Sequence, residues 1–247
     1  MNASRFGSLM VAIASPQSDI FYPTGDGEPV AETYAHFCAI VAIFEVLRQY
    51  LSGQQATVFA NQFLYYVPNF PKLRVAPDVM VIFGVEPGGR DSYKIWVEGK
   101  VPAIIFEITS AGTRRQDFEE KRALYEGLGV SEYWLFDPRG EWIPEKLRGF
   151  RLQNESYTVI SEPHSELLQL DFVVEDELLR FCRRDTGEKL PLPAELTAAL
   201  QHAELQRQQS ETARQQAETA RQQAENARQT AEAELDRYRK KFGALDS

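Results

Sequence analysis

The sequence predicts an α/β (α+β) fold in which a mixed central sheet is flanked by helices, followed by a long C-terminal helix. Two observations carry this prediction. The centre of the chain reads strand, helix, strand, and the last part of the chain contains a seven-residue repeat. With 247 residues, of which 43% are hydrophobic, the chain can bury one sizeable core.

The first predicted element is an amphipathic helix from about Ala31 to Leu51, which ends before Gly53. Its apolar residues recur at helical spacing, so we expect one buried face. That face would contain Phe37, Ile40, Val41, Phe44, Leu47 and Leu51. Two β-rich pieces follow, around residues 56–68 and 76–84, and proline or glycine ends each of them.

The centre of the chain gives the clearest topology. The run VPAIIFEITS at 101–110 is almost continuously apolar, RRQDFEEKRALYEGLG at 114–129 is helical, and SEYWLFDP at 131–138 is apolar again. This order predicts two parallel strands joined by a crossover helix. Further strand-like segments should extend or flank the sheet, at 149–153, 156–161, 167–174 and 178–185.

The C-terminal segment repeats almost literally: ETARQQA at 211–217 and again at 218–224, then ENARQTA at 225–231. Such a period predicts a helix, with alanines in one narrow stripe. The helix could form a coiled coil and a homo-oligomer, or stay a single solvated helix held by alanine propensity and charge pairs. The predicted elements divide the chain into three parts. We expect a mobile or loosely packed N-terminus at 1–27, a globular domain at 28–193 and this helix at 194–247.

The net charge of −9 argues against binding of polyanions by bulk electrostatic attraction. Residues 201–247 contain 8 acidic and 8 basic side chains, so the excess of acid lies in the first 200 residues. Two cysteines without metal-ligand spacing indicate core thiols in a reducing cytoplasm, and no apolar stretch is long enough to span a membrane.

A carboxylate in an apolar strand is the sharpest local anomaly. Glu107 lies within the run IIFEI, where burial is costly unless the side chain is paired, protonated or bound to a cation. Asp78 begins a neighbouring strand directly after Pro77. Two carboxylates at strand ends are ligands that Mg²⁺ prefers, and a bound Mg²⁺ can activate water and offset the charge that grows on a phosphodiester.

Such a site also needs a cation near the attacked phosphate. Lys121 lies on the crossover helix, four residues after Asp117 and on the same face, so it can reach back towards Glu107. Asp117 would orient Lys121 or act as a further acid near the metal. Arg114 and Arg115 precede them by about one turn.

The stretch FEITSAGTRRQDFEEKRALYEGLGVSEYWLFDP, with PDV upstream, resembles the Uma-two-type family of proposed bacterial restriction endonucleases, within the PD-(D/E)XK nuclease superfamily. The resemblance spans roughly residues 20–190. It implies a restriction-endonuclease-like core and assigns metal binding to Asp78 and Glu107. It also assigns the displaced superfamily lysine to Lys121, and supporting roles to Asp117, His36 and Glu32.

These observations lead to two hypotheses. The first is a Mg²⁺-dependent endonuclease, with Mn²⁺ as an alternative metal, that cleaves DNA through Asp78, Glu107 and Lys121. Its local DNA contacts would come from Arg114, Arg115 and Arg122. The second is a catalytically idle nuclease-fold module that assembles through its C-terminal helix. Glu107 and Lys121 could also form a purely structural buried ion pair.

Overall fold

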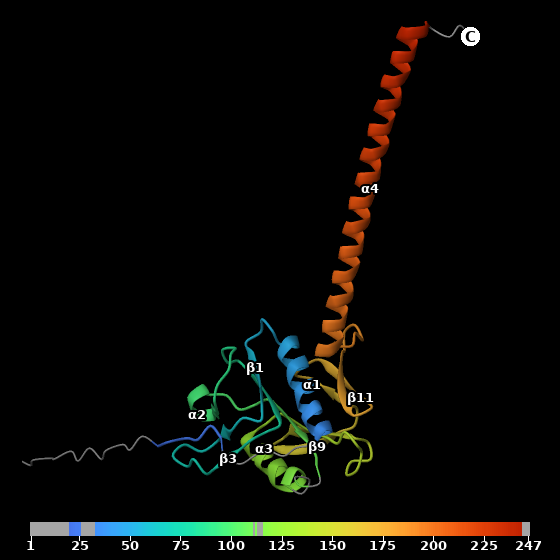
Figure 1. The fold of residues 1–247 in the computed structure, drawn as a ribbon. Coiled ribbons are helices and arrows are strands. Elements are labelled where there is room, and N and C mark those ends of the chain that lie inside the picture. Colours follow the sequence, from blue (N-terminus) through green and yellow to red (C-terminus); the bar gives the residue numbers. More distant parts are fainter. Residues whose placement is uncertain (1–19, 26–32, 111, 113–115, 244–247) are drawn as a thin grey trace, which may run out of the picture. The chain divides into compact units, whose positions relative to one another are not determined.

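The computed structural model describes residues 20–25, 33–110, 112 and 116–243 of the chain. The chain divides into two compact units, residues 1–190 and 191–247. The second unit consists mainly of one continuous helix, α4 (Pro193–Phe242) (Figure 1). Glu195 accepts a hydrogen bond from the backbone N–H of Leu192 and so satisfies one free donor at the start of α4.

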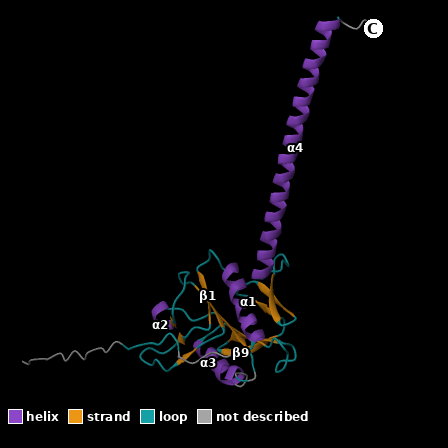
Figure 2. Ribbon diagram, in the orientation of Figure 1, coloured by secondary structure: helices purple, strands orange, loops and turns teal. Residues whose placement is uncertain are grey.

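The first unit is built on a six-stranded mixed sheet in the order β1-β4-β6-β7-β8-β9. Figure 2 distinguishes the strands of this unit from its helices. β6 and β7 are parallel, and all other neighbours are antiparallel. The predicted crossover helix joins β6 to β7 as a π-helical turn, η1 (Gln116–Lys121), and helix α3 (Arg122–Leu128). The strands are β1 (Ala56–Ala60), β4 (Val79–Phe83), β6 (Ile104–Ile108), β7 (Glu132–Phe136), β8 (Leu147–Gln153) and β9 (Ser156–Ile160).

The two faces of this sheet bury different partners, because alternate side chains of each strand point to opposite sides. One face carries Ile105 and Tyr133, in a core that also includes Tyr125 of α3. The other face carries Phe106 and Trp134, which contact the ring of Phe172 with ring centres 5.8 and 4.6 Å apart. The fold is thus the predicted mixed sheet with helices against it.

Helix α1 (Tyr34–Tyr50) begins after Thr33, whose side chain accepts a hydrogen bond from the backbone N–H of His36. Its predicted buried face is partly wrong, since Phe37 is 57% and Val41 38% exposed. The buried stripe contains small residues, which let the helix backbone approach the strands closely. It consists of Ala35, His36, Ala39, Ile40, Ala42, Ile43, Val46 and Leu47.

Two smaller sheets accompany the central one. The first has the order β10-β11-β12 and contains two of the predicted strand segments: β10 (His164–Ser165), β11 (Leu170–Glu175) and β12 (Leu178–Arg183). The second has the order β3-β2-β5 and is followed by a one-turn helix: β2 (Leu64–Tyr65), β3 (Arg74–Val75), β5 (Tyr93–Lys94) and α2 (Ile95–Glu98). Strands of two residues carry no periodic pattern, so the sequence did not indicate β3, β5 or β10.

Gly149 on β8 is a packing requirement of the sheet. It pairs with Trp134 on β7, and a Cβ atom at Gly149 would lie 2.3 Å from the indole Cζ3. We expect Gly149→Ala to lower the free energy of unfolding by about 2–3 kcal/mol, because the buried indole must shift. Urea denaturation measures this. Gly127→Ala on α3, where no atom lies within 4 Å of an added Cβ, is the matched control. Equal stability of the two variants would contradict this packing.

None of the helices in the described part of the chain combines the length and the apolar character required to cross a membrane.

Candidate active site

Asp78 and Glu107 face each other across two neighbouring strands. The antiparallel register of β4 and β6 pairs Val79 with Phe106, so the next pair along the strands is Asp78 and Glu107. Their side chains therefore emerge on the same face, at the carboxyl end of β6. This is also the edge from which the chain leaves β6 towards the crossover helix.

Asp78 is held in a fixed position at this edge. Its Oδ2 accepts a hydrogen bond of 2.6 Å from the backbone N–H of Ile108, the residue after Glu107. The same oxygen lies 3.5 Å from Nε2 of His36, which reaches the site from α1. Asp78 is 9% exposed, so its carboxylate is placed by the strand pair yet reachable from solvent.

Glu107 is completely buried. Its Oε2 lies 2.7 Å from the Lys121 ammonium, and its Oε1 accepts a hydrogen bond of 2.7 Å from the hydroxyl of Tyr125. Both oxygens thus have one donor each. A carboxylate oxygen has two lone pairs, so each oxygen of Glu107 keeps the capacity to accept one further interaction.

The Lys121 ammonium pairs with two carboxylates, those of Glu107 and Asp117. It lies 2.7 Å from Oε2 of Glu107 and 3.0 Å from Oδ1 of Asp117. Asp117 is buried, and both residues lie in the π-helical turn η1, a geometry frequent at functional sites. The predicted reach of Lys121 from the crossover helix to Glu107 is therefore present in the structure.

Burial dominates the electrostatics of the site. It raises the pKa of Glu107 to about 8; Lys121 opposes this shift, whereas Asp78 and Asp117 add to it. For Lys121, burial alone would lower the pKa, but the nearby carboxylates, with Glu107 first, outweigh burial and raise it. Lys121 therefore stays positively charged at neutral pH, while Glu107 holds a proton more tightly than an exposed glutamate does.

The structure does not bring every predicted site residue to this cluster. Glu32, Arg114 and Arg115 lie outside the described residues. Arg122 is exposed on α3, and its guanidinium lies 5.1 Å from the centre of the Phe150 ring on β8. The ring contact explains the conformation of Arg122 without a nucleic acid.

One residue in contact with the acids was missed as a site residue. Tyr125 is buried in the core, and its hydroxyl also donates to Glu107. Burial raises its pKa well above the usual value, so it remains a proton donor in this hydrogen bond. The available signal was its spacing of four residues from Lys121, which places both on one helical face.

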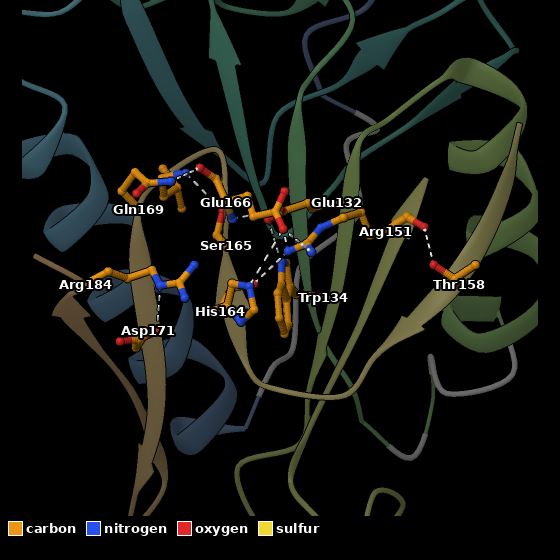
Figure 3. A network of polar contacts seen from close by, with 11 residues as sticks. Glu132, Trp134, Arg151, Thr158, His164, Ser165, Glu166, Gln169, Asp171 and Arg184 are labelled. Carbon is orange, nitrogen blue, oxygen red and sulfur yellow. Dashed lines mark hydrogen bonds and ion pairs between the residues drawn. The ribbon is translucent and has the colours of Figure 1, made fainter. Parts of the chain in front are cut away.

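A second buried carboxylate shows what a structural role looks like in this fold. Glu132 is the first residue of β7. It accepts hydrogen bonds from Arg151, the indole of Trp134 and the backbone N–H of Glu166 (Figure 3). Arg151 also bonds the backbone oxygen of His164. These bonds connect the central sheet to the segment that precedes β11. The same Arg151 guanidinium also lies 2.9 Å from the carboxylate of Glu166.

Asp78 and Glu107 supply two carboxylates that could hold a metal ion. Within the part of the chain that the structure describes, no group of three or more His, Cys, Asp or Glu side chains is arranged to hold a metal ion. Mg²⁺ is bound by one or two carboxylates, with water and substrate oxygens as the other ligands, and the two carboxylates at this edge match that pattern.

Comparisons with known proteins place the chain in a family. A family model described as "Putative restriction endonuclease" (Uma2) matches residues 13–180, which confirms the resemblance inferred from sequence. A solved structure, a "putative nuclease belonging to DUF820" from Anabaena variabilis, is similar with a TM-score of 0.45 and 16% identity. The match covers 60% of this chain and 82% of that one. The chain matches no curated protein.

Proposed function

Because the chain belongs to the Uma2 family, described as "Putative restriction endonuclease", we propose that it is a Mg²⁺-dependent endonuclease that hydrolyses phosphodiester bonds of DNA. The observation that carries this proposal is the convergence of Asp78, Glu107 and Lys121 at the carboxyl end of β6. Mn²⁺ would serve as an alternative metal, since it accepts the same oxygen ligands.

In this proposal the two carboxylates hold the metal, which when bound supplies a Lewis acid and lowers the pKa of a bound water. Asp78 is oriented for this by the Ile108 N–H, and Glu107 by the Tyr125 hydroxyl. Glu107 must lose its proton before it can act as a ligand, because the proton and the metal compete for the same oxygens.

Lys121 supplies the positive charge in this mechanism. Its ammonium stays protonated beside Glu107 and Asp117, and it can donate to a phosphate oxygen or to the attacking water at the same edge of the sheet. Asp117 is a positioning residue, since it contacts Lys121. Arg114, Arg115 and Arg122 remain candidates for contacts to the DNA backbone outside this cluster.

Incubation of the purified full chain with supercoiled plasmid tests the proposal. We expect nicking with Mg²⁺ or Mn²⁺ and none in EDTA. A single-stranded and a double-stranded RNA of the same length establish whether DNA is preferred. Absence of nicking across a range of plasmid sequences and both metals would leave the idle-module hypothesis as the better account.

We further propose that α4 assembles two copies of the chain. The alanine stripe is flanked on one side by a row of arginines seven residues apart, Arg207, Arg214, Arg221 and Arg228, and on the other side by uncharged Gln216, Gln223 and Thr230. In a parallel pair the arginine row faces the uncharged row, whereas in an antiparallel pair arginines face each other. The sequence pattern therefore favours a parallel coiled coil.

Light scattering on the full chain tests this assembly. Ala217→Glu with Ala224→Glu places two charges in the alanine stripe, so we expect the molar mass to fall from that of two chains to that of one. Gln215→Glu with Gln222→Glu adds the same charge on the opposite side of the helix and should leave the mass unchanged. A single-chain mass for the unchanged protein contradicts the assembly.

The cytoplasmic location expected from the cysteines stays a prediction.

A further inference from the structure

An acid-free stretch of the chain ends at the candidate active site. The 17 residues from Asn61 to Pro77 contain no Asp or Glu, although the whole chain has 36 acidic and 27 basic side chains. Asp78 follows this stretch directly. The backbone N–H of Asn61 also donates to the carbonyl oxygens of Pro77 and Asp78, at 3.1 and 3.2 Å. Both ends of the stretch are therefore anchored beside Asp78.

Aromatic side chains from three segments meet on this acid-free region. The hydroxyl of Tyr22 accepts a 2.7 Å hydrogen bond from the backbone N–H of Asn69, next to Phe70. The ring of Tyr22 lies 5.5 Å from that of Trp96 on α2, and the Lys94 ammonium lies 4.7 Å from its centre. Figure 1 shows residues 20–25, β3 and α2 on the same side of the first unit.

We call Phe21, Tyr22, Phe70, Lys94 and Trp96 the aromatic patch. Three of its rings are open to solvent: Phe21 is 78%, Phe70 58% and Trp96 36% exposed. The ring of Tyr22, between them in the chain, is held by Tyr65, 5.0 Å away, as well as by Trp96. Exposed rings beside a cation offer flat apolar faces to a ligand that stacks.

The charges around the aromatic patch limit what can occupy it. The segments that form the patch, residues 20–25, 61–77 and 93–98, contain three basic side chains: Lys72, Arg74 and Lys94. Arg74 is half-buried, with its guanidinium over the ring of Phe63. Three cations neutralise too few phosphates to hold a duplex by counterion release. Base stacking on aromatic rings needs fewer charges, but it requires that the bases are unpaired.

We propose that the aromatic patch binds unpaired bases of the nucleic-acid strand that continues from the scissile phosphate. This inference rests on the proposed nuclease function, which places a phosphodiester at Asp78 and Glu107. The stretch of chain from Asn61 to Pro77, which carries Phe70 and leads directly to Asp78, contains no carboxylate that would repel the strand. The favoured substrate is then a strand that is single-stranded, or locally opened, on one side of the cleavage position.

Fluorescence anisotropy in EDTA tests the proposal without any need for cleavage. The probes are a labelled twelve-nucleotide thymidine oligomer and a hairpin duplex of the same label. We expect the full chain to bind the single strand more tightly than the duplex. Phe70→Ala should weaken single-strand binding about tenfold, the loss typical of one stacked base. Salt should weaken binding with a shallow slope of about −2 in log–log form, as expected for three cations.

Two variants serve as controls. Phe37 on α1 is 57% exposed, almost the same as Phe70, so Phe37→Ala removes a matched ring elsewhere and should leave the affinity unchanged. Phe70→Tyr keeps a stacking face and should retain wild-type affinity. Circular dichroism confirms that each variant is folded.

The outcomes separate this inference from the proposed function. Loss of binding in Phe70→Ala but not in Phe37→Ala supports the aromatic patch, even if the protein does not nick DNA. Equal single-strand affinities of wild type and Phe70→Ala overturn the inference, even if nicking is observed. Tighter binding of the duplex than of the single strand also overturns it.

Discussion

Asp78→Asn and Glu107→Gln should each lower the Mg²⁺-dependent rate of plasmid nicking by about 10³-fold, because each removes one of two carboxylates that hold the metal. The amides keep the shape of the side chains. Asp78→Asn can still accept the Ile108 N–H through its amide oxygen. A gel assay of supercoiled and nicked plasmid over time measures the rates.

Glu120→Gln is the matched control for these variants. Glu120 lies in the same helical turn as Lys121 but is exposed, so its replacement should leave the rate unchanged.

Lys121→Met distinguishes a catalytic role of Lys121 from a purely structural ion pair with Glu107. A catalytic Lys121 predicts a folded variant that has lost most of its nicking, whereas a structural pair predicts lower stability with nicking retained in the folded fraction. Wild-type rates in both Asp78→Asn and Glu107→Gln contradict the site assignment.

In the absence of metal, the protein should lose stability as the pH rises from about 5 to about 8, and Glu107 should be a major cause. Its pKa is about 8 in the folded state against 4.5 for an unperturbed Glu. In that range the folded state keeps a proton that the unfolded chain has released, so unfolding becomes easier as pH rises. Below pH 4.5 both states are protonated and the effect disappears.

Glu107→Gln cannot ionise, so it isolates this effect. Relative to wild type it should gain stability of the order of 4 kcal/mol at pH 8 and about none at pH 4.5. Urea denaturation in EDTA at several pH values measures the difference. Glu120→Gln, which removes an exposed carboxylate, should show no such pH-dependent gain. A constant difference between Glu107→Gln and wild type from pH 5 to 8 contradicts a raised pKa of Glu107.

The central strands and the crossover helix could be predicted because their signals are strong and local. An apolar run around Glu107, a helical segment with glycines at its end and a second apolar run leave few topologies open. The register that places Asp78 opposite Glu107 depends on the pairing of β4 with β6 across 28 residues. No pattern in either strand alone contains that information, although the acids themselves were recognised as anomalous.

The features that sequence reasoning missed are tertiary. Helix α1 offers two apolar faces, and the sheet accepts the one with small side chains, so Phe37 and Val41 point to solvent. Tyr125 looks like an ordinary core residue until the fold places its hydroxyl on Glu107. The aromatic patch joins segments around Tyr22, Phe70 and Trp96 that are remote in sequence and meet only in the folded chain.

The acidity of the chain also has a local explanation. The net charge of −9 opposes bulk attraction of a polyanion, but several acids are engaged within the fold: Glu132 is bonded to Arg151 and Trp134, and Asp117 to Lys121. Coulombic repulsion from distant acids is screened over about 8 Å at physiological salt. The acid-free stretch before Asp78 should therefore repel a polyanion less than the average charge of the chain suggests.

Anomalous diffraction from crystals of the full chain soaked in Mn²⁺ tests whether Asp78 and Glu107 bind a metal, since it locates the metal without reference to activity. We expect one strong peak within coordination distance of both the Asp78 and Glu107 carboxylates, which disappears in Asp78→Asn crystals. No peak at this pair of carboxylates, in crystals of protein that nicks DNA with Mn²⁺, would contradict it.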